Sequence, residues 1–269
     1  MKELEKYKNK IIQGDCLEVM KDISDKSIDM ILCDLPYGTT ACKWDTIIPF
    51  EPLWKEYKRI IKDNGAIVLT ASQPFTSKLV MSNLKMFRYE IIWEKNKASN
   101  FLLLKKQIGK IHENILVFYK NQTKYNPIMV SANPNKIDKR KRFSDLKFKN
   151  GWIGNQELKR TKDNGLRYPT SVIYFDREET DLHPTQKPVA LFEYLIKTYT
   201  SVGDVVLDNT IGSGTTAVAA INTGRNWIGI EMDEGYCKIA NERIKKAYEE
   251  KAGIHRYYQP TPLLPRRDY

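Results

Sequence analysis

The sequence contains few of the residues that hold metal ions or form disulfides. Its 269 residues include only four cysteines and three histidines. The cysteines are Cys16, Cys33, Cys42 and Cys237, so there is no CxxC pair, and the histidines are scattered along the chain. Zinc sites and disulfide frameworks both need such residues at characteristic spacings. The sequence therefore predicts neither a bound metal nor a disulfide-stabilised fold.

Long hydrophobic runs are also missing. No stretch of about 18 apolar residues is present, as a membrane-spanning helix would need. The first ten residues, MKELEKYKNK, are charged and have no apolar segment of the kind found in signal peptides. We therefore expect a protein of a reducing cytoplasm with no membrane partner.

Positive charge is in excess. Lys and Arg number 44 against 33 Asp and Glu, which leaves a net charge of +11. An excess of this size favours a polyanionic partner, of which nucleic acid is the commonest. The composition alone is equally consistent with a basic protein that has no nucleic-acid partner.

Short apolar runs alternate with amphipathic segments in two blocks, at about 10–121 and 184–250. The runs predict strands at 10–13, 28–33, 66–70, 89–94, 114–119, 205–207 and 227–230. The amphipathic segments predict helices at 51–63, 74–85, 188–199 and 234–250, with an Ala-rich helix after residue 215. Alternation of strands and helices predicts a mostly parallel α/β sheet covered on both faces.

A glycine-rich loop, DNTIGSGTT at 208–216, lies between a predicted strand and a predicted helix. Glycines there let the backbone approach a ligand closely. Glu231 ends the next strand, a position from which a carboxylate can bind ribose hydroxyls. The pattern favours a nucleoside-containing cofactor and does not fit a P-loop, since no Gly-Lys-Ser/Thr follows. A tight turn with incidental glycines is the alternative.

The position of this loop is unusual. A doubly wound sheet normally places its ligand loop after the first strand of the chain. Here the loop follows residue 208, near the end of the sequence. The sequence therefore predicts a permuted chain order, in which the N-terminal block supplies the later strands of the sheet.

A second motif, DLPYG at 34–38, directly follows the predicted strand 28–33. One reaction that could use these residues is methylation of an amine on a nucleic-acid base. It needs hydrogen-bond acceptors around the NH₂ group, and a carboxylate beside a main-chain carbonyl whose direction is fixed by proline can provide them. An adjacent aromatic ring can stack on a base swung out of the duplex. In isolation, an ordinary strand-end turn of Asp, Pro and Gly would look the same.

The ordered set of motifs resembles the β-class of DNA amino-methyltransferases, in which a DPPY-type catalytic motif precedes the glycine motif that binds S-adenosylmethionine (SAM). The resemblance covers about 10–121 and 182–250. It is carried by GDCLEVM (14–20), DLPYG (34–38), HENILVFYK (112–120), HPTQKP (183–188), DNTIGSGTT (208–216) and GIE (229–231). It implies a permuted, Rossmann-like, SAM-dependent methyltransferase sheet with an inserted target-recognition region.

The resemblance also implies roles for single residues. Asp34 and the carbonyl of Leu35 accept hydrogen bonds from the target amine. Pro36 belongs to the same catalytic motif, and Tyr37 stacks on the flipped base. Leu35 departs from the usual proline, which puts rigidity in doubt but leaves the main-chain oxygen in place. The implied cofactor-binding residues are Asp15, Cys16, His183, Thr185, Lys187, Asp208, Thr210, Gly212, Gly214, Thr215 and Glu231.

The reaction implied is methyl transfer from SAM, which becomes S-adenosylhomocysteine, to the N6 amine of adenine in double-stranded DNA after base flipping, without a metal. Asp34 at the first motif position points to adenine, whereas Ser is usual for cytosine. The alternatives are N4-cytosine methylation, a catalytically inactive DNA-binding protein with the SAM fold and, more distantly, a nicotinamide oxidoreductase. A homodimer and a cognate restriction endonuclease stay open as partners, in a bacterial or phage-infected cell.

The segment between the blocks, 122–177, lacks clear alternation. Within 136–149, seven Lys and Arg stand against two Asp, with aromatic residues interleaved as on many nucleic-acid surfaces. A solvated basic loop is the alternative. The expected organisation is a catalytic half (1–121), a target-recognition insert (122–177), a SAM-binding half (178–252) and a basic tail (253–269). The expected DNA-binding residues are Lys139, Arg140, Lys141 and Arg142.

Overall fold

The structure is a computed structural model that describes residues 2–39, 45–131, 147–148, 156–157, 165–178 and 186–254. The chain divides into two compact units. The first is Met1–Asn126 with Thr170–Tyr258, and the second is Pro127–Pro169 with Gln259–Tyr269. Among the described residues, no helix is long and apolar enough to span a membrane.

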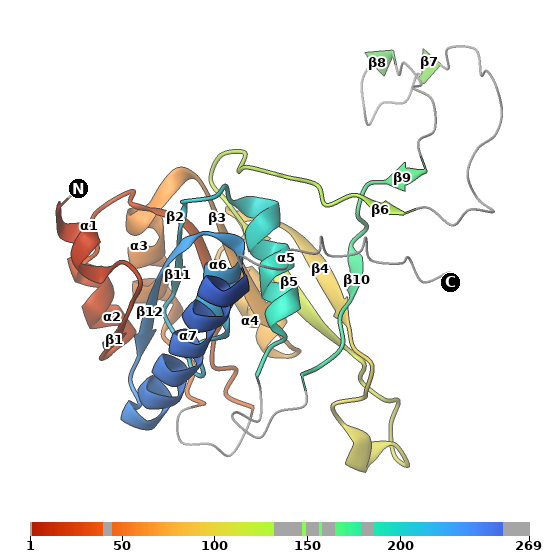
Figure 1. Cartoon of the computed structure of the whole chain (residues 1–269). Coiled ribbons are helices and arrows are strands. Elements are labelled where there is room, and N and C mark those ends of the chain that lie inside the picture. Colours follow the sequence, from red (N-terminus) through yellow and green to blue (C-terminus); the bar gives the residue numbers. More distant parts are fainter. Residues whose placement is uncertain are drawn as a thin grey trace. The chain divides into compact units, whose positions relative to one another are not determined.

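An eight-stranded sheet forms the centre of the first unit (Figure 1). Its strands in spatial order are β1 (Lys10–Gln13), β12 (Asn226–Glu231), β11 (Val205–Asp208), β2 (Ile28–Asp34), β3 (Ile61–Ala71), β5 (His112–Phe118), β4 (Phe87–Glu94) and β10 (Val172–Tyr174). Strand β5 is antiparallel to both neighbours, and the other pairings in this sheet are parallel. The predicted mostly parallel α/β sheet is confirmed.

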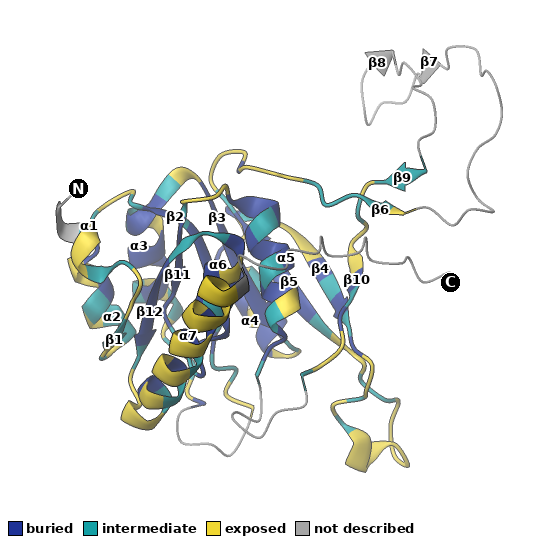
Figure 2. Ribbon diagram, viewed as in Figure 1, coloured by how far each residue is buried: buried dark blue, intermediate teal, exposed yellow. Residues whose placement is uncertain are grey.

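Helices cover both faces of the sheet (Figure 1). One face carries α5 (Val189–Tyr199), α6 (Thr215–Thr223) and α7 (Glu234–Ile254), and the other carries α2 (Cys16–Val19), α3 (Phe50–Ile60) and α4 (Phe75–Ser82). Helix α1 (Lys2–Tyr7) precedes β1, and the 3₁₀ turns η1 (Met20–Asp22) and η2 (Phe101–Leu103) complete the unit. Strands between the two layers are buried (Figure 2), which explains why β2 and β11 read as nearly continuous apolar runs.

The direction of winding changes beside β11. From β11 the chain crosses through α6 to β12 on one side, whereas from β2 it crosses through α3 to β3 on the other. Open α/β sheets bind ligands in the crevice at the carboxyl ends of strands where the order reverses in this way. The glycine-rich loop follows β11 and the DLPYG loop follows β2. The permuted order therefore brings both motifs to the same edge of the sheet.

The end of α3 differs from the helix predicted to residue 63. Ile61 pairs with Ile28 at the start of β2, so β3 begins as soon as the helix ends. Gly65 lies within this strand at a register shift, where an added Cβ would meet the carbonyl oxygen of Asp29 at 2.8 Å. Burial of Ile61 against the strand, a tertiary effect, overrides the local helical pattern.

The described part of the second unit contains two short antiparallel pairs. They are β6 (Val130–Ser131) with β9 (Leu166–Arg167), and β7 (Lys147–Phe148) with β8 (Gln156–Glu157). The expected insert, 122–177, is longer than this unit, because β10 extends the main sheet through its pairing with β4. Three residues of strand are too few to produce an alternation signal. The four expected DNA-binding residues at 139–142 lie outside the described residues.

Candidate active site

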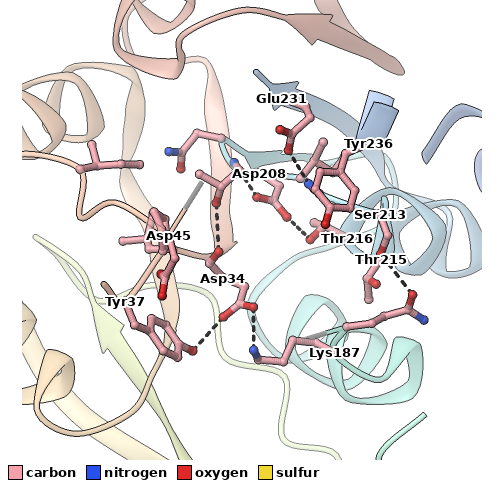
Figure 3. Close-up of a pocket in the computed structure, with 18 of the residues that line it drawn as sticks. Asp34, Tyr37, Asp45, Lys187, Asp208, Ser213, Thr215, Thr216, Glu231 and Tyr236 are labelled. Carbon is pink, nitrogen blue, oxygen red and sulfur yellow. Dashed lines mark hydrogen bonds and ion pairs between the residues drawn. The ribbon is translucent and has the colours of Figure 1, made fainter. Parts of the chain in front are cut away.

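A cavity of about 760 Å³ lies at the carboxyl ends of β2, β11 and β12 (Figure 3). This volume is within the range of cofactor and small-molecule sites. Predicted site residues that line it are Asp15, Cys16, Asp34, Leu35, Pro36, Tyr37, Lys187, Asp208, Thr210, Gly212, Thr215 and Glu231. The fold thus brings residues from several separate sequence motifs to one cavity.

Gly214 does not line this cavity. Its φ is +87°, and an added Cβ would meet the Cβ of Ala240 in α7 at 3.1 Å. Glycine is needed there for the left-handed backbone and for the close packing of α7 against the start of α6. The remaining expected cofactor residues, His183 and Thr185, lie outside the described residues.

The carboxylate of Glu231, at the end of β12, holds the glycine-rich loop. Its Oε2 accepts a hydrogen bond from the amide of Gly212 at 2.9 Å (Figure 3). Its Oε1 accepts from the amides of Met232 and Asp233, each at 2.9 Å. A carboxylate has about four acceptor positions, so one remains beyond these three bonds. Glu231 therefore shapes the loop and still offers an acceptor to a ligand hydroxyl.

Asp208, at the end of β11, is a buried carboxylate. It accepts hydrogen bonds from the amide of Thr210 at 3.0 Å and from the hydroxyl of Thr216 (Figure 3). Burial raises the pKa of Asp208 to about 7 in spite of these bonds, and the nearby carboxylate of Asp34 contributes in the same direction. A cation bound beside Asp208 would favour its ionised form. The position suits the ammonium group of a ligand.

The side chain of Asn209, like that of Asp208, indicates that the cavity binds a polar ligand. Its Oδ1 accepts from the Tyr57 hydroxyl and, at 2.9 Å, from the Cys33 thiol. Its Nδ2 is buried and makes no hydrogen bond to the described residues, although the side chain lines the cavity. A buried donor without an acceptor costs about 1–3 kcal/mol, which a ligand acceptor would recover.

Asp34 ends β2 and points into the cavity (Figure 3). Its Oδ1 accepts from the Tyr37 hydroxyl at 2.8 Å and from the Thr70 hydroxyl. Its Oδ2 accepts from the ammonium of Lys187 at 2.6 Å. The Thr210 hydroxyl donates to the main-chain oxygen of Asp34 at 3.2 Å and so joins the two motif loops. Two donors occupy Oδ1, which leaves an acceptor position on Oδ2.

The Tyr37 ring is held in a fixed orientation. It stacks on Phe75, with centroids 5.1 Å apart and an interplanar angle of 24°. The Lys187 ammonium lies 5.6 Å from the Tyr37 ring centroid. Burial, with a smaller contribution from Asp34, raises the pKa of Tyr37 well above its usual value, so its hydroxyl remains a donor. A preordered aromatic ring beside an oriented carboxylate is suited to a planar heterocycle that carries an amine.

A cluster of buried charges extends from Asp34, and sequence reasoning missed part of it. Glu113, in β5, pairs with Lys95 at 2.8 Å and with Lys187 at 3.4 Å. Burial alone would raise the pKa of Glu113, but the two ammonium groups lower it to about 2. Burial would lower the pKa of Lys187, but Asp34 and Glu113 together raise it. The available signal was Glu113 near the start of a strand whose later residues, ILVF, are all apolar.

This cluster bears on the expectation that Lys187 binds the carboxylate of a cofactor. Its ammonium is already committed to Asp34 and Glu113. An ammonium has three donors, so one remains for a ligand carboxylate. Lys187 thus stands between the two halves of the cavity, with the DLPYG loop on one side and the glycine-rich loop on the other (Figure 3).

Comparison with known proteins gives consistent matches over nearly the whole chain. Residues 28–242 match the family model described as DNA methylase, N6_N4_Mtase. The DNA adenine methyltransferase YhdJ of Escherichia coli K12 is 32% identical over 254 residues, covering 88% of this chain and 83% of that protein. The type II methyltransferase M.HinfI of Haemophilus influenzae is 29% identical over 275 residues, covering 91% and 71%. A crystal structure of an M1.HpyAVI–SAM complex matches with a TM-score of 0.58 and 25% identity, covering 87% and 98%.

Proposed function

The chain belongs to the DNA methylase family, and from this premise we propose that it transfers the methyl group of SAM to the N6 amine of adenine in double-stranded DNA. DNA methylation with SAM follows from the family and its relatives. The choice of adenine is the proposal, because the family name covers both N6 and N4 amines. It is supported by the name of the E. coli relative and, above all, by an oriented carboxylate, Asp34, at the first position of the DLPY motif.

SAM fits the half of the cavity formed by the glycine-rich loop. When bound, it supplies a methyl group on a positively charged sulfur. We assign its ribose hydroxyls to Glu231 and its ammonium to Asp208, which both face the cavity with acceptor capacity. The remaining donor of Lys187 suits its carboxylate. Asp15 and Cys16, which line the same cavity, would border its adenine ring.

The DLPY loop supplies the acceptors for the target amine. The nitrogen lone pair of adenine is delocalised into the ring and is a weak nucleophile. Acceptance of its two N–H bonds by Asp34 Oδ2 and by the carbonyl of Leu35 would favour the tetrahedral nitrogen of the transition state. Because Tyr37, Thr70 and Lys187 already orient Asp34, no reorganisation is needed during the reaction. The amine nitrogen would then attack the methyl carbon directly, without a covalent bond to the enzyme, while S-adenosylhomocysteine leaves and the nitrogen loses one proton to its acceptor at Asp34.

The test is the chemical identity of the product. Unmethylated plasmid DNA is incubated with the protein and SAM that carries a deuterated methyl group, then digested and analysed by mass spectrometry. We expect labelled N6-methyladenine. Labelled N4-methylcytosine without methyladenine would support cytosine as the target. DNA that carries no label at all would support a DNA-binding protein that does not catalyse methyl transfer. Asp34→Ala serves as the control for a contaminating methylase.

We assign target recognition to the insert at 122–177 and phosphate contacts to its basic residues at 139–142. Neutralising Lys139, Arg140, Lys141 and Arg142 should weaken binding to all DNA sequences alike. The salt dependence should flatten by about 0.9 in slope for each phosphate whose ionic interaction is removed. Exchanging the insert for that of a relative with another specificity should transfer the methylated sequence. A folded, SAM-binding chimera that keeps the original site would place recognition elsewhere.

The type II name of M.HinfI supports a cognate restriction endonuclease as a partner, acting in a bacterial cytoplasm. Such an endonuclease would cleave plasmid DNA before but not after treatment with this methyltransferase. A homodimer is the assembly that we would test first, by sedimentation equilibrium with and without DNA.

A further inference from the structure

The connection between β4 and β5 is an ordered projection from the sheet, which we call the β4–β5 protrusion (residues 95–111; yellow in Figure 1). Its base is closed by a hydrogen bond from the amide of Ser99 to the carbonyl of Lys110 at 2.9 Å. The side chain of Asn100 then crosses the turn. Its Oδ1 accepts from the amide of Lys110 at 2.6 Å, and its Nδ2 donates to the carbonyl of Ile108 at 3.0 Å. The backbone is therefore held in a defined shape.

The tip of the protrusion exposes large apolar side chains. Phe101 is 66% exposed, Leu102 82% and Ile108 94%, and Leu103 and Leu104 are exposed beside them. Single exposed apolar residues are normal on a soluble protein, but a cluster on a preformed turn marks an interaction site. The hydrogen bonds that fix the turn do not cover this cluster, so a partner is needed to bury it.

The protrusion lies at the edge of the sheet where the candidate active site is found. Strand β4 is antiparallel to β5, which is antiparallel to β3, so β4 ends at the same edge as β3 and β2. Ser99 and Phe101 line the cavity that contains Asp34. The ammonium of Lys110 donates to the hydroxyl of Ser72, which follows β3. The apolar tip therefore borders the place where the target base must arrive.

Its charge indicates what the partner is. The sequence KNKASNFLLLKKQIGKI contains five lysines and no acidic residue. One of them, Lys95, is paired inside the cavity with Glu113, whereas Lys105 and Lys106 are exposed next to the apolar tip. In a two-fold dimer built on this surface, the lysines of one copy would face those of the other. DNA offers phosphates to the lysines and base faces to the apolar side chains.

We propose that the β4–β5 protrusion inserts its apolar tip into the DNA stack beside the flipped target base, with Lys105 and Lys106 on the flanking phosphates. Removing a base from the stack leaves its neighbours without a stacking partner. Apolar side chains are known to wedge between partly unstacked base steps. Phe101 is the best placed, since it combines exposure with a position on the cavity wall. The proposal rests on the DNA-methylating function.

The test compares Phe101→Ala/Leu102→Ala with the wild type on a synthetic duplex that contains the methylated sequence found by long-read sequencing. A second duplex carries an abasic site opposite the target adenine, where flipping costs less. We expect kcat/KM to fall about tenfold to a hundredfold on the intact duplex, the range typical of one stacking contact. On the abasic duplex the loss should be threefold or less, and SAM affinity should be unchanged. Met81→Ala/Leu84→Ala, which truncates two exposed apolar residues before β4, at the opposite edge, is the matched control.

The lysines are tested separately. Lys105→Gln/Lys106→Gln should lower the slope of log affinity against log salt by about 1–2. Lys245→Gln/Lys246→Gln, a pair of exposed lysines on α7, should leave the slope unchanged. Equal loss of activity on intact and abasic duplexes, full activity on both, or a change of oligomeric state in the Phe101/Leu102 variant would each overturn the proposal. If the wild type itself does not methylate adenine, the proposed function fails instead.

Discussion

Replacement of Asp34 by asparagine tests the centre of the proposed mechanism with little change in shape. Three donors surround the carboxylate: the Tyr37 and Thr70 hydroxyls on Oδ1 and the Lys187 ammonium on Oδ2. An amide has one oxygen, so its NH₂ group must face either the two hydroxyls or the ammonium. The side chain either turns its NH₂ towards the target amine or loses its orientation. Loss of an oriented acceptor of this kind typically lowers the rate about 10²–10³-fold.

The stability of the variant can be anticipated from the same interactions. Removal of one partner from a buried ion pair typically costs about 3–5 kcal/mol when the remaining charge is left alone. Lys187 retains Glu113 at 3.4 Å, so its charge stays compensated. We therefore expect a loss of about 1–3 kcal/mol in the free energy of unfolding, the cost of a weakened hydrogen bond to a buried group, which is below the range for an isolated charge. The variant should remain folded and measurable.

The assay is single-turnover transfer of tritiated methyl groups to DNA, with SAM affinity measured by calorimetry on the same preparation. SAM affinity should stay within a few-fold of the wild type, because the acceptance of a target N–H matters mainly in the transition state. Asp63→Asn is the control, since this carboxylate pairs with Lys26 and Lys120 on the surface. Wild-type transfer rates in folded Asp34→Asn would refute the catalytic assignment. A large loss of SAM affinity with normal transfer of bound SAM would make Asp34 a cofactor residue.

Three further predictions concern the glycine-rich loop and its surroundings. Glu231→Gln should weaken SAM binding by about 1.5–3 kcal/mol in calorimetry, because a charged acceptor is removed, and unchanged affinity would remove Glu231 from the cofactor site. SAM affinity should rise between pH 6 and pH 8, because Asp208, with a pKa raised to about 7, must be ionised to hold an ammonium. Asp208→Asn should flatten this pH dependence of the affinity, and an equally steep dependence in the variant would contradict the assignment. Gly214→Ala should cost about 1–3 kcal/mol in chemical denaturation through its left-handed backbone and its packing against Ala240. Gly203→Ala, with a similar φ of +86° and nothing within 4 Å, measures the backbone part alone, and equal losses in the two variants would refute the packing argument.

The strands that carry the motifs could be predicted because they are buried on both faces. The apolar runs that lead to Asp34 and Asp208 have no polar face, and each strand ends at that aspartate. The sequence predicted the permuted order of the DLPYG and glycine-rich loops, and the family resemblance implied that they act at one site. Their adjacency in the sheet itself is seen only in the pairing of β2 with β11.

The buried charge cluster could not be anticipated in the same way. Lys95 follows β4, Glu113 lies in β5 and Lys187 precedes α5, and no spacing rule relates these three positions. Their proximity depends on the antiparallel pairing that places Glu94 opposite His112. Only tertiary structure brings them together. The same pairing aims the β4–β5 protrusion at the site, which local sequence describes only as an apolar turn rich in lysine.

In the permuted chain order, the segment to which we assign target recognition lies between the two blocks that carry the catalytic and SAM-binding motifs. The positions of Asp34 and Asp208 depend on the pairing of β2 with β11, not on the length of chain that joins their blocks. The segment 127–169 belongs to the second compact unit, together with 259–269, so its sequence can vary without moving a strand that carries a motif. The β4–β5 protrusion has no such freedom, because both of its ends are strands beside the cavity. We therefore expect exchange of the segment to alter which sequence is methylated, and changes in the protrusion to alter how readily any target base is flipped.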